Sequence, residues 1–299
     1  MAKEITGHTK LICLLGSPVS HSISPSMHNA SFKALDLDYA YLAFNVDTDT
    51  LEDTVNTLKN IGARGWNLTM PCKNRMAELC DELSPAAKIS GSVNTVVNEN
   101  GILTGHTTDG IGFLRSAKEA GHDLTGKKIV LLGAGGASTS ILVQAALDGA
   151  SEIVVFSRPG KFYDRAIGII DNLNQQTHCN CHIHEFADLT LLKEELMNSY
   201  ILINGTSVGM APDTDACIIP DASFFHKNLV VADVIYNPRE TKLLTMAKEA
   251  GCNTFNGMYM LLYQGAEAFR LWTGKEMPVE LVKERYFWPL TRAISLSMA

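Results

Sequence analysis

The sequence lacks the features that would place it in a membrane or on a nucleic acid. Its 299 residues contain no apolar run near the ~18 residues of a membrane span, and the first residues lack the apolar core of a signal peptide. No basic block occurs, and the formal net charge of −7 disfavours DNA or RNA as a partner. We therefore expect a cytoplasmic protein that binds neither a membrane nor a nucleic acid.

A disulfide framework and a metal-binding framework are also missing. The seven cysteines are odd in number and scattered along the chain, which favours reduced thiols. One cluster alternates so that Cys179 and Cys181 share one face of a strand, while His182 and His184 share the other. Ligands that point in opposite directions, without a second cluster, do not form a zinc site. We expect inward-facing thiols here and no metal.

Strand-like and helix-like stretches alternate along the first 120 residues, in a chain that is 46% hydrophobic and 19% charged. Such a composition can bury a substantial core, and the length favours two domains. Strands are expected over 10–15, 39–46, 65–68, 93–98 and 102–106, with helices from Pro25, over 48–61, from Pro71 and over 111–120. Asn100-Gly101 predicts a tight hairpin turn, the antiparallel part of a mainly parallel sheet. The pattern predicts an α/β fold.

A polar link over 121–126 marks the expected domain boundary. A strand over 128–132 leads into a glycine-rich turn and a helix, and further strands are expected over 153–156, 179–183, 201–203 and 229–232. The last fifty residues are expected to form helices. We predict a substrate-binding and catalytic domain over 1–121, a Rossmann-like dinucleotide-binding domain over 122–254, and C-terminal helices over 255–299 that pack back on the first domain.

The glycine-rich turn predicts nucleotide binding. Gly133 and Gly135 would let the backbone approach a pyrophosphate at the N-terminus of the following helix, although Ser138 replaces the third glycine of the usual fingerprint. After the next strand the chain offers Ser157, Arg158 and Lys161, with no acid before residue 164 to bond a ribose 2′-hydroxyl. This favours a 2′-phosphate and hence NADP. If Arg158 stacks on adenine instead, NAD remains usable.

Two groups upstream of this turn could move protons. Lys73 stands at the start of a predicted helix, whose dipole favours a neutral amine, whereas a nearby Asp109 carboxylate would favour the protonated form. Taken singly, Lys73 is typical of a solvated surface residue and Asp109 of a helix N-cap. Their occurrence together with the motifs below favours a proton-transfer pair.

These motifs together resemble the shikimate dehydrogenase family over nearly the whole chain and in the family's order. The matching segments are Ser20–Pro25 with His28-Asn29, Asn67–Lys73, Ser92–Thr95, Gly105–Gly110, Gly133–Ala137, Asn204–Met210, Asp233–Thr241 and Asn256–Gln264. The stretch 156–188 is closer to the quinate/shikimate dehydrogenase branch. Ser157-Arg158-Pro159 replaces the Asn-Arg-Thr triplet common in the strict NADP enzymes, and Gly160 stands where the dual-cofactor branch tends to carry Asp.

The resemblance implies reversible, NADP(H)-dependent reduction of 3-dehydroshikimate to shikimate, a step of chorismate and aromatic amino acid biosynthesis. It implies that Lys73 transfers the proton and that Asp109 positions Lys73 and the substrate hydroxyl. The implied substrate-binding residues are Ser22 and Ser24 for the carboxylate, Thr69, Asn94, Asp109 and Gln264 for the ring hydroxyls, Lys73 at the reacting ring carbon, and Tyr236 on the nicotinamide side of the cleft. The implied cofactor-binding residues are Gly133, Ala134, Gly135, Gly136, Ala137, Ser157, Arg158, Lys161, Thr206 and Gly257.

Other interpretations of single residues remain open. Ser22 and Ser24 could serve only as turn and cap residues, Tyr236 as a buried core aromatic, and Gln264 as an exposed helix residue. At the level of function, the alternatives are a quinate/shikimate dehydrogenase that uses NAD, a non-catalytic ligand sensor on the same scaffold, and a folate-linked dehydrogenase of related architecture. The sequence does not fix the oligomeric state, and a homodimer is kept as a candidate.

Overall fold

The computed structural model describes residues 4–287 and divides into two compact units. The first comprises the described parts of Met1–Thr108 and Gly265–Ala299, and the second is Asp109–Gln264. The boundaries expected at residues 121 and 254 separate a substrate-binding part from a dinucleotide-binding part. This functional division stays a prediction. The last twelve residues of the expected C-terminal helices lie outside the described range.

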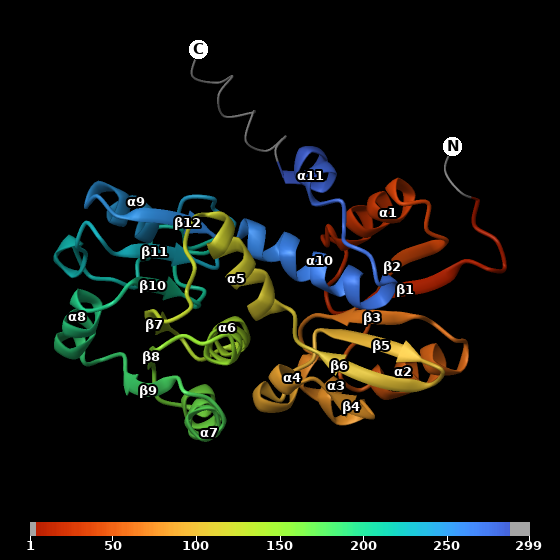
Figure 1. The fold of residues 1–299 in the computed structure, drawn as a ribbon, viewed down its shortest axis with the longest axis horizontal. Coiled ribbons are helices and arrows are strands. Elements are labelled where there is room, and N and C mark those ends of the chain that lie inside the picture. Colours follow the sequence, from red (N-terminus) through yellow and green to blue (C-terminus); the bar gives the residue numbers. More distant parts are fainter. Residues whose placement is uncertain (1–3, 288–299) are drawn as a thin grey trace, which may run out of the picture. The chain divides into compact units, whose positions relative to one another are not determined.

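The first unit is built on a mixed six-stranded sheet of order β2-β1-β3-β5-β6-β4 (Figure 1). Strand β1 pairs in parallel with β2 and β3, whereas β5 pairs antiparallel with both β3 and β6. The strands are β1 (Lys10–Gly16), β2 (Tyr39–Asn45), β3 (Gly65–Leu68), β4 (Glu82–Leu83), β5 (Thr95–Glu99) and β6 (Ile102–His106). The expected hairpin is therefore present as β5 and β6, and it is the antiparallel part of the sheet.

Helices from both ends of the chain complete the first unit. They are α1 (Ser24–Ala34), α2 (Leu51–Asn60), α3 (Lys73–Leu79), α4 (Pro85–Ser90), the second half of α10 (Met258–Thr273), α11 (Val279–Val282) and a π-helical turn η2 (Lys283–Phe287). Trp272 of α10 donates a hydrogen bond from Nε1 to the carbonyl oxygen of Val96 at 2.9 Å. Gly65 permits this approach, because an added Cβ there would lie 2.5 Å from the Trp272 Nε1 atom. The second half of α10 thus contributes to the core of the unit that the N-terminal residues build.

A buried histidine lies at the centre of this core. His28 of α1 is fully buried, and its ring stacks on Tyr41 with a centroid distance of 4.6 Å and meets Trp272 edge-on at 5.3 Å. Neither ring nitrogen of His28 has a hydrogen-bond partner among residues 4–287. Burial in this apolar setting lowers the pKa of His28 to about 3, so the ring is neutral at physiological pH.

The second unit is a parallel six-stranded sheet of order β12-β11-β10-β7-β8-β9. Its strands are β7 (Lys128–Leu132), β8 (Glu152–Ser157), β9 (Asn180–Glu185), β10 (Ile201–Asn204), β11 (Val230–Asp233) and β12 (Asn253–Asn256). Counted from β7, the spatial order reads 3-2-1-4-5-6, the doubly wound arrangement of dinucleotide-binding domains. The four central strands, β7, β8, β10 and β11, consist almost entirely of buried residues, as expected of a parallel sheet covered on both faces.

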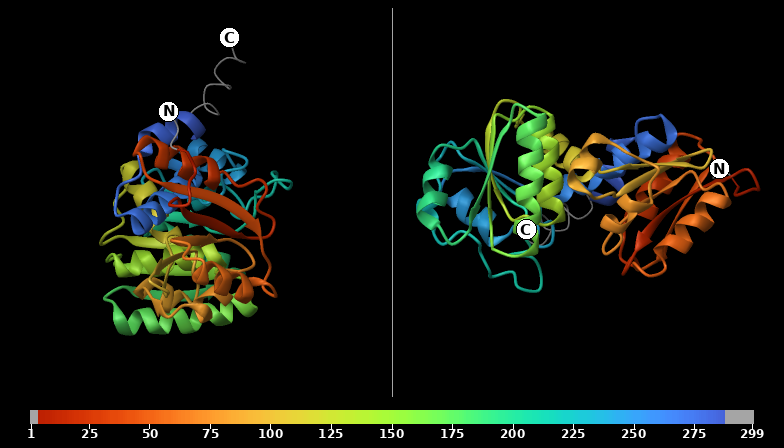
Figure 2. Two further views of the ribbon diagram at one scale, coloured as in Figure 1. Left: turned by 90° about the vertical axis from the view of Figure 1, so that its right-hand side faces the viewer. Right: turned by 90° about the horizontal axis from the view of Figure 1, so that it is seen from below.

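Helices cover both faces of the second sheet, which the right-hand view of Figure 2 shows edge-on. The helical elements are α5 (Asp109–Glu119), α6 (Gly136–Leu147), α7 (Lys161–Gln176), α8 (Leu189–Met197), the 3₁₀ turn η1 (Ala222–Phe224), α9 (Lys242–Glu249) and the first half of α10. The mixed α/β architecture predicted from the sequence is confirmed. No helix within residues 4–287 has the length and apolar character needed to cross a bilayer.

Three details of the sequence interpretation need comment. Ser24 was expected to cap α1, but it lies inside the first turn, and the N-cap is Ile23 without a side-chain cap bond. Residues 80–92, which carry no clear periodicity, form β4 and α4, and the short strand β12 was also not expected. The seven cysteines are free, and Cys179 and Cys181 are buried on one face of the β9 segment, as the alternation predicted.

Candidate active site

The second unit has a cavity of about 780 Å³ at the carboxyl ends of β7, β8 and β10. Three loops line it, residues 133–135, 156–162 and 205–208, together with Phe186, Cys217 and Ile218. Between β7 and β10 the strand order of the sheet reverses, which is where doubly wound sheets bind their ligands. The cavity therefore stands where a dinucleotide is expected.

The glycine-rich turn has the shape that a pyrophosphate needs. Gly133 adopts φ +95°, and a Cβ there would lie 2.8 Å from the Thr206 methyl group, so a side chain fits neither the backbone nor the space. At Gly135 and Gly136 a Cβ would meet nothing within 4 Å. The N-terminus of α6 begins at this open space, with Ala137 in its first turn. Backbone N–H groups and the helix dipole there favour a bound phosphate.

Ser138, which stands where the usual fingerprint has its third glycine, packs closely against Gly205. Its hydroxyl donates to the carbonyl oxygen of Gly205 at 3.0 Å and so ties α6 to the loop after β10. A Cβ at Gly205 would lie 2.1 Å from the Ser138 oxygen. The close approach of helix and strand thus depends on glycine at 205 rather than at 138.

The far end of the cavity is basic and partly apolar. Arg158 and Lys161 are exposed there, while Ser157 is buried at the end of β8. Gly160, between them, adopts φ +134°, a conformation that favours glycine. The lining also includes Phe162, Phe186 and Ile218, whose apolar surfaces suit an adenine ring. Sequence reasoning missed these three, because only the strand order shows that their loops adjoin the glycine-rich turn.

Two expected cofactor-side residues lie elsewhere in the second unit. Gly257 is buried, and a Cβ there would lie 1.9 Å from the carbonyl oxygen of Val234, so close packing already requires glycine. Tyr236 is 48% exposed, so its interpretation as a buried core aromatic is wrong.

In the first unit, three of the expected substrate-binding segments come together. The N–H of Leu68 donates to the carbonyl oxygen of Asn94 at 2.8 Å, and the N–H of Val93 donates to that of Lys73 at 2.9 Å. The end of β3 with Thr69, the start of α3 with Lys73 and the start of β5 are thereby tied into one edge. These segments lie apart in the sequence, and the sheet register brings them together.

A buried network of neutral polar groups underlies this edge. The hydroxyl of Tyr41 donates to Oδ1 of Asn67 at 2.7 Å and also bonds the Ser24 side chain. Nδ2 of Asn67 donates to the Thr95 hydroxyl at 3.0 Å. Oδ1 of Asn94 accepts the N–H of Thr108 at 2.8 Å. The network connects the Ser24 turn with the Asn94 position, and the Ser22 hydroxyl belongs to it by accepting the N–H of Ser24 at 3.2 Å.

Asp109 and Gln264 lie at the two chain crossings between the units. Asp109 begins α5 and directly follows Thr108, so peptide connectivity alone keeps its backbone one residue from the Asn94 network. Gln264 is half-buried, and its Nε2 donates to the carbonyl oxygen of Leu261 at 3.1 Å. The interpretation of Gln264 as an exposed helix residue is therefore wrong. The pairing of Lys73 with Asp109 stays a prediction.

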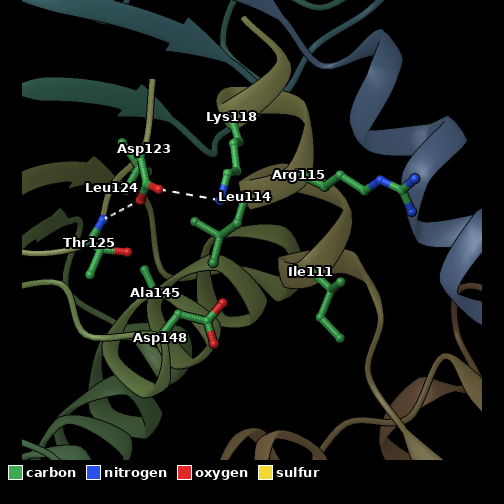
Figure 3. Close-up of a pocket in the computed structure, with 9 residues that line it drawn as sticks. All are labelled: Ile111, Leu114, Arg115, Lys118, Asp123, Leu124, Thr125, Ala145 and Asp148. Atoms are coloured by element: carbon green, nitrogen blue, oxygen red, sulfur yellow. Dashed lines mark hydrogen bonds and ion pairs between the residues drawn. The ribbon is translucent and has the colours of Figure 1, made fainter. Parts of the chain in front are cut away.

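A smaller cavity of about 250 Å³ lies beside α5 and has a different character (Figure 3). Its rim is charged, and Lys118 pairs with Asp123 at 3.5 Å. The Arg115 side chain points away from the cavity, and its guanidinium lies 4.6 Å from the centre of the Tyr263 ring. Leu114 and Ala145 supply a small apolar floor. Nothing in this arrangement selects a ligand, and among residues 4–287 no group of three or more metal-binding side chains could hold a metal ion.

The second unit has a doubly wound parallel sheet, with a cavity at the carboxyl ends of its strands that the glycine-rich turn lines. These features define a dinucleotide-binding α/β protein. Comparison with known proteins makes this specific. Residues 14–96 match the shikimate dehydrogenase substrate binding domain, and residues 257–285 match the shikimate 5'-dehydrogenase C-terminal domain.

Full-length relatives agree. The chain is 48% identical to the shikimate dehydrogenase (NADP(+)) of Listeria innocua over 96% of this chain and 99% of that protein. It is 44% identical to a quinate/shikimate dehydrogenase of Escherichia coli, covering 94% and 98% of the two chains. The crystal structure of shikimate 5-dehydrogenase from Listeria monocytogenes in complex with shikimate and NAD superposes with a TM-score of 0.93 at 48% identity, over 96% of this chain and 99% of that one.

The chain therefore belongs to the shikimate dehydrogenase family, whose members are NAD(P)-dependent oxidoreductases that act on a CH–OH group. This confirms the family assignment made from the sequence motifs, and it favours an enzyme over a ligand sensor.

Proposed function

We propose that this protein catalyses the reversible reduction of 3-dehydroshikimate to shikimate with NADP(H), a step of aromatic amino acid biosynthesis. The observation that carries the proposal is the cavity at the sheet's reversal point. Its glycine-rich end can approach a pyrophosphate, and its other end offers Arg158 and Lys161 without an acid. The 48% identity to a shikimate dehydrogenase (NADP(+)) supports the same substrate and cofactor.

Within this proposal the second unit binds the dinucleotide through the residues around its cavity. Gly133, Gly135 and the first turn of α6 hold the pyrophosphate, and Ser157, Arg158 and Lys161 hold the 2′-phosphate. Thr206 lines the cavity beside them, whereas Gly257 acts through close packing. When bound, the nicotinamide supplies the hydride.

The first unit binds the substrate. Ser22 and Ser24 hold the carboxylate, and Thr69 and Asn94 hold ring hydroxyls, together with Asp109 and Gln264 from the two chain crossings. Hydroxyl and amide groups suit a polyol because they both donate and accept hydrogen bonds. An analogue that leaves one of them unpaired loses about 1–3 kcal/mol of binding free energy.

Lys73 performs the proton transfer. In reduction its ammonium gives a proton to the oxygen that develops negative charge at the ring carbon, and in oxidation its amine accepts that proton. Asp109 orients Lys73 and the substrate hydroxyl, and Tyr236, exposed on the second unit, contacts the substrate on the nicotinamide side. The protein thereby supplies geometry and a proton, and the cofactor supplies the redox chemistry.

Steady-state kinetics with shikimate and quinate, each with NADP and NAD, test the proposal. We expect kcat/KM to be highest for shikimate with NADP, by about tenfold over NAD, since the 2′-phosphate adds charge-assisted hydrogen bonds. No oxidation of shikimate with either cofactor would refute the activity. A preference for NAD would refute the proposed role of Arg158 and Lys161.

A quinate/shikimate dehydrogenase that also uses NAD is the second candidate. The 44% identity to the Escherichia coli quinate/shikimate dehydrogenase favours it, and the similar Listeria monocytogenes structure contains NAD. The same four assays separate the two candidates, because the second requires comparable kcat/KM for quinate.

Two further expectations belong to this proposal. A homodimer is supported by β2, an edge strand whose Leu42 and Phe44 side chains are 50% and 40% exposed. Light scattering coupled to size-exclusion chromatography gives the molar mass that decides it. The cytoplasmic location stays a prediction, and cell fractionation tests it.

A further inference from the structure

The loop after β10 forms one wall of the dinucleotide cavity, and Asn204 determines its shape. Oδ1 of Asn204 accepts two hydrogen bonds from Thr206, from the backbone N–H at 3.0 Å and from the hydroxyl at 2.7 Å. Nδ2 of Asn204 lies 3.4 Å from the carbonyl oxygen of Val208, to which it donates. One side chain thus holds both ends of the Thr206–Val208 segment that lines the cavity.

Asp233, at the end of the neighbouring strand β11, contacts the Asn204 side chain and is not part of the cavity lining. Its carboxylate is completely buried and accepts from Nδ2 of Asn204 at 3.1 Å, from the N–H of Ile235 at 3.0 Å and from the Thr241 hydroxyl at 2.7 Å. Asn204 is the hydrogen-bonded link from Asp233 to Thr206 of the lining.

The direction of these hydrogen bonds is fixed by the chemistry of a carboxylate. A carboxylate only accepts, so the amide of Asn204 must turn its NH₂ group toward Asp233 and its oxygen toward Thr206. The hydroxyl of Thr206 therefore donates its hydrogen bond to Oδ1 of Asn204. The same hydroxyl oxygen accepts the N–H of Val208 at 3.2 Å and keeps one lone pair.

We propose that Asp233 is a positioning residue for the dinucleotide, which acts through Asn204 to hold Thr206 with its hydroxyl oxygen as a hydrogen-bond acceptor toward the cavity. The ligand group that Thr206 takes is accordingly a donor, such as a ribose hydroxyl or an amide NH₂ of the cofactor. The inference rests on the proposed use of this cavity for NADP(H).

Binding of NADPH, followed by its fluorescence without turnover, tests the proposal. Asp233→Ala removes the acceptor, so we expect the Kd for NADPH to rise about tenfold, while the KM for shikimate at saturating NADP stays within about twofold of wild type. Asp233→Asn keeps an oxygen beside the Ile235 N–H and Nδ2 of Asn204. We expect this conservative variant to restore the Kd to within about threefold.

Thr241→Val is the matched control for a merely structural role. It removes the hydroxyl that bonds the other carboxylate oxygen of Asp233 and that caps α9, without touching Asn204. We expect a lower Tm with a Kd for NADPH within about twofold of wild type. The positioning role fails if Asp233→Ala binds NADPH like the wild type, or if Thr241→Val weakens binding as much as Asp233→Ala does.

If Asp233→Ala does not fold, Thr206→Val provides the measurement. It keeps the branched shape and removes the hydroxyl, and we expect the same tenfold weakening, whereas an unchanged Kd would overturn the relay. A wild-type protein that binds no NADPH at all would instead refute the proposed function, so the two failures are distinguishable.

Discussion

The two sheets bury polar groups at their carboxyl ends in different ways. In the first unit the buried hydrogen bonds described above join neutral groups, the hydroxyl of Tyr41 and the amides of Asn67 and Asn94 among them. The second unit uses a charged one, since the completely buried carboxylate of Asp233 orders its neighbours. Neutral groups can reverse donor and acceptor roles, whereas a carboxylate imposes one direction on every partner.

The difference fits the tasks proposed for the two units. A polyol presents hydroxyls that both donate and accept, so a neutral network can adjust to it. A dinucleotide needs backbone N–H groups held in place around its phosphates, which a fixed loop provides. The comparison also predicts different responses to substitution and to pH, and the following four experiments examine it in order of expected effect.

Replacing the proton-transfer group should affect only the chemistry of the first unit. For Lys73→Ala we expect kcat to fall about 10³-fold while the KM for shikimate changes modestly, because proton transfer is lost and most substrate contacts remain. Steady-state rates at saturating NADP measure this. Lys88→Ala, on the exposed face of α4, is the control and should keep wild-type kcat. Retained turnover in Lys73→Ala would remove this residue from the mechanism.

Acid should weaken the first unit through His28. Folding holds its pKa at about 3, below the ordinary 6.5, so the unfolded chain binds more protons between these values. The contribution of the neutral ring is complete above pH 6.5 and is lost as the pH falls toward 3. The cost reaches about 5 kcal/mol of unfolding free energy. Urea denaturation followed by tryptophan fluorescence, to which Trp66 and Trp272 of this unit contribute, measures it from pH 7.5 to 4.5.

The same experiment sharpens the contrast between the units. Burial raises the pKa of Asp233 above 3.8, so the folded state holds its proton more readily, and this group disfavours folding as the pH rises through the raised value. Acid therefore acts in opposite directions through His28 and Asp233. In His28→Phe the pH dependence should flatten, whereas His8→Phe at an exposed position should keep it. Equal acid sensitivity in the two histidine variants would contradict the assignment to His28.

Removing the basic end of the cavity should affect the second unit alone. For Arg158→Ala we expect the KM for NADP to rise about tenfold and the KM for NAD to stay nearly constant, because only NADP carries the 2′-phosphate. Arg75→Ala, which breaks exposed ion pairs in the first unit, should change neither value. An equal rise for both cofactors would indicate that Arg158 stacks on adenine instead.

The smallest effect is expected where α6 meets the β10 loop. Ser138→Ala leaves the Gly205 carbonyl without its 3.0 Å partner, so we expect a loss of about 1 kcal/mol of stability and a severalfold higher Kd for NADPH. Ser31→Ala removes a comparable buried bond, 2.9 Å to the Met27 carbonyl oxygen, in the first unit. It should lower the Tm similarly without changing the Kd. Matching Kd changes in both variants would show that the effect is not local.

The sequence predicts where helices and strands lie along the chain better than it predicts which strands pair with one another. Hydrophobic periodicity and turn chemistry located most strands, the β5–β6 hairpin and the glycine-rich turn, because these signals are local. The order of strands is set by packing between distant segments, so the approach of β10 to β7 could not be predicted from periodicity. The capping role expected for Ser24 failed for the same reason, since its hydroxyl is engaged by Tyr41 in the assembled core.

The candidate site shows the same division. The residues with distinctive chemistry, such as Lys73 and Arg158, could be chosen from motifs. Their supporting partners could not. Nothing in the sequence around Tyr41 or Asn67 predicts that the Tyr41 hydroxyl donates a hydrogen bond to Oδ1 of Asn67 at 2.7 Å. Phe186 joins the cavity only because β9 lies beside β8.

The use of α10 by both units has a consequence for how the protein is made. Phe269 and Trp272 complete the ring cluster around His28, yet they leave the ribosome after all of residues 109–264. The first unit cannot complete its core until Phe269 and Trp272 have been translated, whereas the second unit is one continuous piece of chain. During synthesis the second unit, residues 109–264, can therefore fold before the first unit does. The N-terminal segments complete their core only when the second half of α10 has emerged.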